Sequence, residues 1–260
     1  MALLDELLRA LWTDQAAIAP QAARVHQLLR DRGEAVRIDH IAMRTFDVPG
    51  VDIDALDRAF VAEGYDAAQT YELPRRKLIA YHYEHRDDPG RPKLLFSALL
   101  VDELSREAQA IVRGLVDQLE PGAAAHPSFA VSGRSWQLSS SDLMTLRAES
   151  EDAAWVAAFG FRAGHFSIDA SGLCGFDGLA GLNRFLVESG YGVDQAGGEV
   201  KGSPAELLEQ SATVAELVDV ELADRSVRMP SCPCEFARRY PQADGTLFQG
   251  FLPLALSSCP

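Results

Sequence analysis

The sequence predicts an α+β fold built from two related halves inside a single domain. A strand that carries one histidine, followed by a helix and then by several strands, occurs once in each half of the chain. Helical patterns precede the first half, and no low-complexity segment or flexible linker interrupts the chain. We expect one domain over residues 1–260, with N-terminal helices over 1–33, a first half over 35–133, a connecting helix over 139–158 and a second half over 160–260.

The first 33 residues predict two helices, because apolar side chains recur in them at helical spacing. These side chains are Leu3, Leu4, Leu7, Leu8 and Leu11 in the first helix, and Ala22, Val25, Leu28 and Leu29 in the second. The dipeptide Ala19-Pro20 separates the two helices, since a proline disfavours the helical conformation in the residue before it. Gly33 is a suitable C-terminal cap for the second helix.

The first half predicts a buried strand, a helix and two further strands. Residues 35–46 are largely apolar, and the turn-forming triplet Val48-Pro49-Gly50 follows them. A helix over 51–64 ends at a glycine. The later elements are strands over 77–83 and 92–100 and a helix over 102–119.

The second half repeats this order in outline. A helix over 139–158 leads into a strand over 161–169, which carries the second histidine, and then into a helix over 175–190. The glycine-rich segment 197–204 predicts a loop. Further strands are expected over 217–222, 226–229, 234–239 and 247–252.

The composition is that of a globular protein, with 47% hydrophobic and 24% charged residues. Asp and Glu number 38 against 24 Lys and Arg, and the resulting net charge of -14 repels the phosphate backbone of nucleic acids. We therefore predict no nucleic-acid partner. The four cysteines lack the paired C-x2-C spacing of a zinc ribbon and are too few for a disulfide scaffold.

The sequence also lacks the patterns of a membrane protein. No run approaches the about 18 consecutive apolar residues of a membrane span. Asp5 and Glu6 stand where a signal peptide needs positive charge. We predict a cytoplasmic protein without a membrane partner. The sequence does not indicate an oligomeric state.

Two of the six histidines, His40 and His165, occupy the middle of otherwise apolar strands. A buried imidazole needs a partner, because an unpaired buried polar group costs about 1–3 kcal/mol. Each could be a hydrogen-bonded histidine of the core. Their matching positions in the two halves favour a second interpretation, in which the strands meet at a shared axis and the imidazoles converge on one point.

Arg44 is a candidate for binding a ligand near the first histidine. Strand alternation places His40 and Arg44 on one face, with their backbones about 13 Å apart. A planar guanidinium is suited to a carboxylate, so Arg44 could bind a ligand carboxylate close to His40. It could equally pair with an acidic side chain at the end of the strand.

Glu235 is the third candidate for a metal site. It lies among Cys, Phe and Ala in the expected strand 234–239, where a buried carboxylate requires a cation or a metal ion. A salt bridge to Arg238 or Arg239 is the alternative. Two imidazoles and one carboxylate on three strands would form a facial set with open positions, which favours a non-haem Fe(II) centre that reacts with O2 over structural zinc.

Five segments of the chain resemble the DUF1338 family, whose characterised members are 2-oxoadipate dioxygenase/decarboxylases. The segments are DHIAMRTF (39–46), YELPRRKLIAYHY (71–83), AAWVAAFGFRAGHFSID (153–169), LLEQSATVAELVDVEL (207–222) and SCPCEFARRYPQADGTLFQGF (231–251). They follow the family's order over most of the chain. The resemblance implies a curved mixed sheet of βαβββ-like units around a metal, related to the vicinal oxygen chelate fold.

The resemblance also implies the site and the reaction. His40, His165 and Glu235 would ligate Fe(II), for which Zn, Ni or Mn could substitute in a purified sample, and Arg44 would bind a substrate carboxylate. The substrates would be O2 and a small 2-oxo dicarboxylic acid, with no separate 2-oxoglutarate. Oxidative decarboxylation and hydroxylation would convert 2-oxoadipate to 2-hydroxyglutarate, a step of lysine catabolism.

Two features depart from the family's pattern, and two other functions stay open. Gly164 precedes His165 where the family has Asn, and LPLALSSCP follows QGF in place of an Ala-Asp-Lys-Ile-Phe-Glu-Ser-Thr run. One alternative function is a metal enzyme of the same fold that performs non-oxidative chemistry, such as isomerisation or hydrolysis. The other is a protein that has lost turnover and only binds a small ligand.

Overall fold

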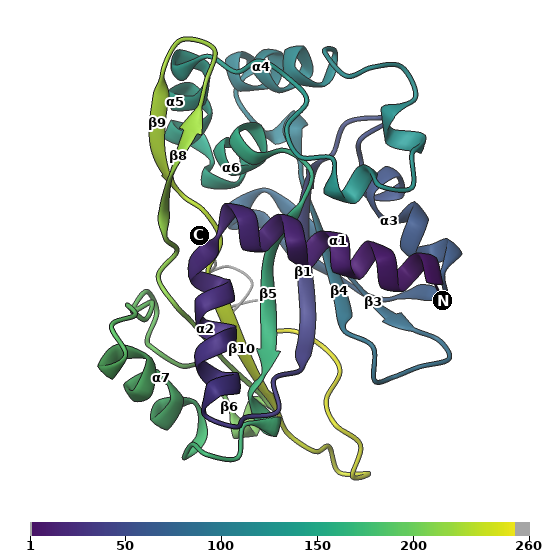
Figure 1. Ribbon diagram of the computed structural model, residues 1–260. Helices are drawn as coiled ribbons and strands as arrows, with labels where there is room; N and C mark the ends of the chain where they lie inside the picture. Colours follow the sequence, from purple (N-terminus) through teal and green to yellow (C-terminus); the bar gives the residue numbers. More distant parts are fainter. Residues whose placement is uncertain (1, 253–260) are drawn as a thin grey trace.

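An eight-stranded mixed sheet forms the centre of the molecule (Figure 1). The computed structural model describes residues 2–252, so the divergent residues 253–260 lie outside the described part of the chain. The strand order in the sheet is β2-β3-β4-β1-β5-β10-β7-β6, and β8 and β9 form a separate hairpin. The strands are β1 (Ile38–Phe46), β2 (Tyr65–Leu73), β3 (Leu78–His85), β4 (Lys93–Leu99), β5 (Ala163–Asp169), β6 (Lys201–Ser203), β7 (Leu208–Ala212), β8 (Leu217–Glu221), β9 (Ser226–Pro230) and β10 (Cys234–Arg239).

The sheet consists of two halves with the same topology. The first half runs β1-α3-β2-β3-β4 and the second runs β5-α7-β6-β7-β10, with the β8–β9 hairpin inserted before its last strand. β1 pairs in parallel with β4, as β5 does with β10, and the antiparallel pair of β1 and β5 joins the halves. The prediction of an α+β fold with a mixed sheet of two βαβββ-like halves is confirmed.

Helices cover one face of the sheet and one of its ends. The helices are α1 (Ala2–Ile18), α2 (Pro20–Asp31), α3 (Ile53–Ala62), α4 (Arg106–Val116), α5 (Ser140–Glu149), α6 (Glu151–Phe159) and α7 (Gly178–Glu188). α1 and α2 cross the face of β1, β5 and β10, and α4, α5 and α6 gather with the β8–β9 hairpin at one end (Figure 1).

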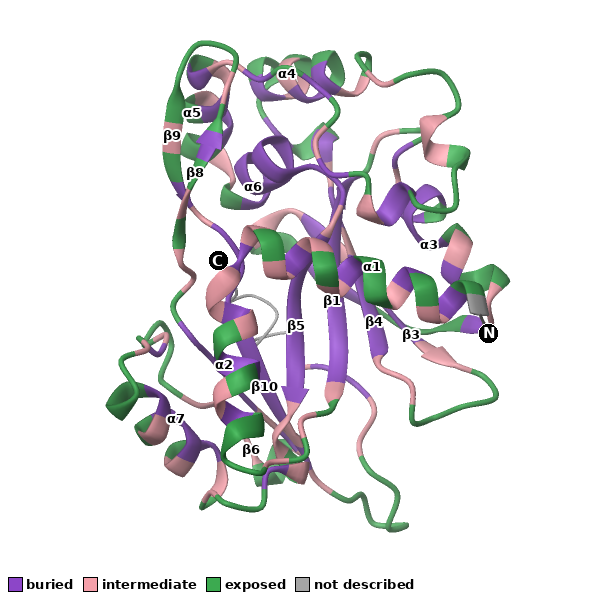
Figure 2. Cartoon of the chain, viewed as in Figure 1, coloured by how far each residue is buried: buried purple, intermediate pink, exposed green. Residues whose placement is uncertain are grey.

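The main core lies between the sheet and these helices (Figure 2). Leu4 and Leu11 of α1 and Leu29 of α2 are fully buried, as are Ile41 and Met43 of β1 to within about 1%. Burying one such side chain stabilises the fold by about 1.5–3 kcal/mol. The helical spacing of the N-terminal leucines therefore reflects packing against the central strands.

The segment predicted as one connecting helix over 139–158 forms two helices instead. Ser150 ends α5 in an extended conformation, with φ of -152°, and its hydroxyl accepts a hydrogen bond from the backbone N–H of Ala153 at the start of α6. A serine in this position competes for backbone hydrogen bonds and so favours a new helix start. The break directs the first turn of α6, with Asp152, toward the sheet.

Three strands were missed because their sequences lack the pattern of a buried strand. β2 is an edge strand with mostly exposed residues, and β6 is a three-residue edge strand inside the segment predicted as a loop. β7 contains Glu, Gln and Ser at positions that are buried or half-buried in the sheet. Because polar residues occupy these positions, the sequence does not show the apolar pattern by which a buried strand is recognised.

The strand predicted over 247–252 is absent, since Leu247 makes only an isolated bridge to Pro241. The carbonyl groups of Phe248 and Gly250 accept hydrogen bonds from the side chain of Arg239 rather than from a strand. Across residues 2–252, none of the helices combines the length and the apolar character needed to cross a bilayer.

Candidate metal centre

Three buried side chains from the central strands converge on one point. His40 lies on β1, His165 on β5 and Glu235 on β10, so both halves contribute to the cluster. His40 Nε2 lies 3.2 Å from Glu235 Oε1, His165 Nε2 lies 3.4 Å from Glu235 Oε2, and the two Nε2 atoms are 3.3 Å apart. The structure thus brings together the three residues that the sequence singled out as candidate ligands.

The spacing of these donor atoms fits a divalent metal ion. Bonds of about 2.1 Å place neighbouring donors about 3.0 Å apart in an octahedral site and about 3.4 Å apart in a tetrahedral one. In the cluster the two Nε2 atoms are 3.3 Å apart, and each lies 3.2 or 3.4 Å from a different oxygen of Glu235. One donor atom from each of the three residues lies within 4.8 Å of the other two. Three donors this close together occupy one face of a coordination sphere, which leaves the opposite positions for small ligands.

Two irregularities in the pairing of β1 with β5 direct the histidines. The register shifts twice, so that Asp39 in β1 and Gly164 in β5 are extra residues, each directly before a cluster histidine. Such bulges re-aim the neighbouring side chain and are frequent beside active sites. They turn His40 and His165 toward the cavity on one face of the sheet. The neighbouring Phe166 points to the other face, where it packs against Trp12 of α1.

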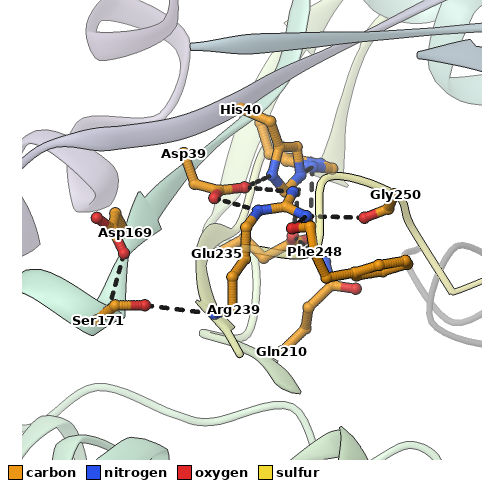
Figure 3. A network of polar contacts seen from close by, with 10 residues as sticks. Asp39, His40, Asp169, Ser171, Gln210, Glu235, Arg239, Phe248 and Gly250 are labelled. Atoms are coloured by element: carbon orange, nitrogen blue, oxygen red, sulfur yellow. Dashed lines mark hydrogen bonds and ion pairs between the residues drawn. The ribbon is translucent and has the colours of Figure 1, made fainter. Parts of the chain in front are cut away.

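Asp39 and Arg239 hold the ring of His40 (Figure 3). His40 Nδ1 donates to Asp39 Oδ2 at 2.8 Å, and the guanidinium of Arg239 donates to both oxygens of Asp39 at 2.6 and 2.9 Å. Because the hydrogen bond fixes the proton on Nδ1, the Nε2 atom is left as the metal-binding nitrogen. The carboxylate that Arg239 pairs with is thus Asp39, whereas the sequence offered Arg239 as a partner of Glu235.

The ionisation of these groups follows from their surroundings. Burial alone would raise the pKa of Asp39, but the hydrogen bond from His40 and the charge of Arg239 bring that pKa well below its usual value. Burial lowers the pKa of His40, and its hydrogen bonds with Asp39 and Glu235 outweigh burial and raise it. The carboxylate of Asp39 is therefore charged and anchors the imidazole.

His165 lacks a comparable support on its other nitrogen. Its Nδ1 atom is buried without a hydrogen-bond partner among residues 2–252, and Gly164 offers no side chain at the bulge. Burial lowers the pKa of His165 to about 4, an effect that Glu235 opposes and that His40 and Arg44 increase. The ring is therefore neutral, which is the form that ligates a metal.

Glu235 is oriented by Gln210 of β7. Gln210 Nε2 donates to Glu235 Oε1 at 2.7 Å, and the other amide atom of Gln210, Oε1, is buried without a partner among the described residues. The pairing of β10 with β7 places the two residues on one face of the sheet. A hydrogen bond of this kind to a ligating carboxylate fixes the direction of its oxygens.

Arg44 lies on the same face of the sheet as the cluster. It contacts an acidic side chain, Asp152, which is the alternative that the sequence offered to a ligand carboxylate. Its Nε lies 3.5 Å from Asp152 Oδ1, and its guanidinium carbon lies 5.3 Å from the centre of the Trp155 ring. Arg76, in the 3-10 turn Pro74–Arg76, donates two hydrogen bonds to Asp152, at 2.9 and 2.6 Å. Two arginines thus lie beside the cluster, with one carboxylate in contact with both.

Two cavities adjoin the cluster. A cavity of about 30 Å³ is lined by the three candidate ligands together with Arg44, Arg76 and Gln210, among others. This is the volume of about one water molecule in the liquid. A second cavity, of about 370 Å³, shares Gln210 and Glu235 with the first and extends along Ser211, Val214 and Leu217. Gln210 therefore stands where the small cavity meets the large one.

Five residues that surround the candidate ligands are not indicated as site residues by the sequence pattern. They are Asp39, Arg76, Asp152, Gln210 and Arg239. Asp39 carried a usable signal, because it is an acidic residue directly before a histidine within an apolar strand. The others are recognisable only by contacts between distant segments.

Two plant proteins with the same name are similar to most of the chain. A chloroplastic 2-oxoadipate dioxygenase/decarboxylase of Arabidopsis thaliana is 33% identical over 217 residues, which is 77% of this chain and 58% of that protein. A chloroplastic/amyloplastic protein of the same name from Oryza sativa is 31% identical over 234 residues, 85% of this chain and 64% of its own length. The chain thus spans about three fifths of the length of these relatives.

Solved structures agree with the fold and with the family. A provisionally named hydrolase from Shewanella frigidimarina is 44% identical, with a TM-score of 0.91 and coverage of 96% of this chain and 97% of that one. A hydroxyglutarate synthase from Oryza sativa, in complex with 2-oxoadipate, is 26% identical, with a TM-score of 0.91 and coverage of 98% and 90%.

More distant structures indicate the fold alone. One is a protein from Ralstonia eutropha described as glyoxalase superfamily, at 21% identity and a TM-score of 0.77 over 94% of this chain and 84% of that one. Another, from Shigella flexneri, includes the domain DUF1338 and is 16% identical, with a TM-score of 0.69 over 91% and 75%. No family model matches the chain. The evidence for its family is its similarity to the Arabidopsis and rice proteins. The chain belongs to the family of the proteins named 2-oxoadipate dioxygenase/decarboxylase, the family that its motifs predicted.

Proposed function

We propose that the protein is a metal-dependent oxygenase that decarboxylates and hydroxylates a small 2-oxo dicarboxylic acid. The observation that carries this proposal is the cluster of His40, His165 and Glu235, whose donor atoms fit one face of a metal ion next to a cavity lined by arginine. The names of the relatives support the reaction, and the complex of the rice hydroxyglutarate synthase supports 2-oxoadipate as the type of substrate.

The proposed metal is Fe(II). Two imidazoles and one carboxylate on one face are the donor set of non-haem Fe(II) oxygenases. Bound Fe(II) would supply the one-electron chemistry that O2 requires and that amino-acid side chains lack. Zn, Ni or Mn would fit the same donors, because the affinity of such a site follows the general order of divalent metals rather than its function.

The proposed reaction balances without a further reductant. 2-Oxoadipate and O2 together contain the atoms of 2-hydroxyglutarate and CO2. The bond between the carboxylate carbon and the keto carbon breaks, which releases two electrons, and a C–H bond of the shortened acid breaks to become C–OH, which releases two more. These four electrons reduce O2. One oxygen atom enters the new carboxylate and the other enters the new hydroxyl group, so no separate 2-oxoglutarate is consumed.

The chain's own residues would bind and orient the acid. Arg44 would donate hydrogen bonds to a substrate carboxylate, since its guanidinium lines the cavity that holds the cluster. Asp152 contacts both Arg44 and Arg76 and would keep the two cations at a fixed spacing. The cavity of about 30 Å³ must widen to admit a six-carbon acid, and the larger cavity beyond Gln210 is the nearest space.

Reconstitution without oxygen tests the proposal. The protein is loaded with Fe(II) anaerobically, and O2 uptake and CO2 release are measured with 2-oxoadipate and with its shorter and longer homologues. We expect uptake and release in a ratio near one. Turnover of an oxo acid without O2 uptake would instead establish a non-oxidative enzyme, and ligand binding without any turnover would establish a binding protein.

A further inference from the structure

Arg239 joins the candidate ligand His40 to a stretch of chain near the C-terminal end of the described residues. Its guanidinium donates four hydrogen bonds. Two go to Asp39 at 2.6 and 2.9 Å, and two go to the carbonyl oxygens of Phe248 and Gly250 at 3.0 and 2.8 Å (Figure 3). The residue is only 6% exposed. A buried cation with this many partners fixes the position of each of them.

The first pair of hydrogen bonds leads to the metal site. Asp39, at the bulge in β1, accepts from His40 Nδ1 at 2.8 Å. The backbone of Arg239 is itself held in β10, the strand that carries Glu235 four residues earlier. One strand therefore supplies a candidate ligand directly and, through Asp39, sets the orientation of a second.

The second pair of hydrogen bonds leads to residues 248–251, which we call the closing segment. The ring of Phe251 lies edge-on to the ring of His40, with 4.8 Å between centroids, and 5.1 Å from the guanidinium carbon of Arg239. The backbone N–H of Phe251 donates to the hydroxyl of Tyr71 on β2 at 2.9 Å. Phe251 is 3% exposed, so the closing segment shields His40 from solvent.

We propose that Arg239 is a positioning residue that couples the seating of a metal ion on His40 to the closure of residues 248–251 over the site. When the closing segment leaves, the guanidinium loses two acceptors and the Phe251 ring, and its hold on Asp39 loosens. When Asp39 and His40 are fixed by a metal ion, the guanidinium is fixed as well and presents its remaining N–H groups to the two carbonyls. The two events thus favour each other.

This coupling depends on the shape of the side chain and not only on its charge. A guanidinium offers five N–H donors in a rigid plane and can serve two oxygens of a carboxylate and two carbonyls at once. An ammonium group is a compact charge with three donors and cannot span the same partners. A lysine at position 239 would therefore keep the charge in the core and lose the coupling.

Co(II) is a suitable probe, because its visible spectrum reports coordination without turnover. Co(II) affinity and the hydrogen exchange of backbone amides in residues 248–252 are measured for the protein and for Arg239→Lys. In the unchanged protein we expect Co(II) to slow exchange in this segment. In Arg239→Lys we expect Co(II) to bind about 10- to 100-fold more weakly and to leave exchange in the segment unchanged. Arg238→Lys, one position away on the same strand, is the matched control and should behave like the unchanged protein.

A second variant tests the coupling by loosening the closing segment instead of changing Arg239. Tyr71→Phe removes the hydroxyl group that accepts a hydrogen bond from the backbone N–H of Phe251. This hydroxyl also contacts His82, and within the described residues it makes no hydrogen bond with Arg239 or His40. Reciprocal linkage requires that loosening the closing segment also weakens Co(II) binding. A several-fold loss of affinity supports the proposal, and it decides the matter if Arg239→Lys does not fold.

The proposal is overturned if Arg239→Lys keeps the Co(II)-dependent protection of residues 248–252, or if Tyr71→Phe opens the segment without any change in Co(II) affinity. The inference rests on the proposed metal site but not on the proposed reaction. If the Fe(II) protein consumes no O2 while Co(II) still protects the segment, the oxygenase assignment fails and the coupling stands. If Co(II) does not bind at all, both fail.

Discussion

Asp39 and Gly164 occupy equivalent positions in the two halves of the sheet, each as the extra residue of a bulge directly before a candidate metal ligand. The equivalence ends at their side chains. Asp39 binds Nδ1 of the following histidine, His40, whereas Nδ1 of His165 has no partner among the described residues. The ring of His40 is therefore held from its Nδ1 side by a carboxylate and an arginine, whereas the ring of His165 makes polar contacts within the described residues only through Nε2, with Glu235 and His40.

Replacing Glu235 by Gln is expected to abolish stoichiometric binding of a divalent metal. The amide keeps the shape of the side chain, but it lacks the negative charge and one of the two oxygen donors that face the histidines. Metal content after dialysis and the circular dichroism spectrum are the two measurements. Glu209→Gln, on the neighbouring strand β7, is the control and should keep the metal. A Glu235→Gln protein with one bound metal per chain would remove this residue from the ligand set.

Replacing Arg44 by Ala is expected to raise KM for 2-oxo dicarboxylic acids by about 10- to 100-fold, the effect of losing a charge-assisted hydrogen bond of about 1.5–3 kcal/mol. The effect should be much smaller for a 2-oxo acid with a single carboxylate. Steady-state kinetics on both kinds of acid provide the comparison, with the exposed Arg75→Ala as control. If KM and kcat are unchanged on every dicarboxylic acid tested, the assigned role of Arg44 is wrong.

Replacing Gln210 by Ala is expected to shift chain-length preference toward longer 2-oxo acids. The variant removes the side chain between the cavities of about 30 and 370 Å³. One methylene group in a pocket is worth about 1–3 kcal/mol, so the ratio of kcat/KM between a longer acid and 2-oxoadipate should rise about 10-fold or more. Gln195→Ala, at an exposed position, is the control. An unchanged preference would show that Gln210 does not limit chain length.

The metal-free protein is expected to lose stability as the pH falls from about 6.5 to about 4. His26 packs against Trp12 at 4.3 Å between ring centroids, and burial, aided by Arg30, lowers the pKa of His26 to about 4. The unfolded chain binds a proton near pH 6.5 while the folded chain does not, so folding is penalised within this window. For one such histidine the loss between pH 7 and pH 5 is about 2 kcal/mol.

His26→Phe tests the contribution of this one residue. Urea unfolding at pH 7 and pH 5 should show a smaller loss of stability in the variant, by about 2 kcal/mol. His165, whose pKa is lowered to about 4, and His82, whose pKa is also lowered, add to the remaining pH dependence, whereas the raised pKa of His40 opposes them. His126→Phe, at an exposed position, should leave the pH dependence as it was. An identical pH dependence in His26→Phe and the unchanged protein would contradict this account.

The sequence predicted the two histidine strands because they are buried on both faces and therefore read as apolar runs with one polar exception. Glu235 stood out for the same reason in β10. β2 was missed because an edge strand with exposed Ala, Gln and Thr resembles a loop. A local pattern therefore indicates a buried strand more reliably than an exposed one.

The support around the ligands could not be predicted from local patterns. Arg239 contacts Asp39 across 200 positions of sequence, and Asp152 meets Arg76 across 76. Such pairs depend on how the two halves are joined, which a single sequence does not reveal. The cytoplasmic location and the absence of nucleic-acid and membrane partners stay predictions from composition.

The strands that carry the three candidate ligands have a consequence for the order in which the site forms during synthesis. β1 and β5 lie next to each other in the sheet, but β10, which enters between β5 and β7, is the last of the described strands to be made. Domains form from their N-terminal side as the ribosome extends them. The two histidines can therefore meet before Glu235 is available, and the three candidate ligands come together only when β10 is in place.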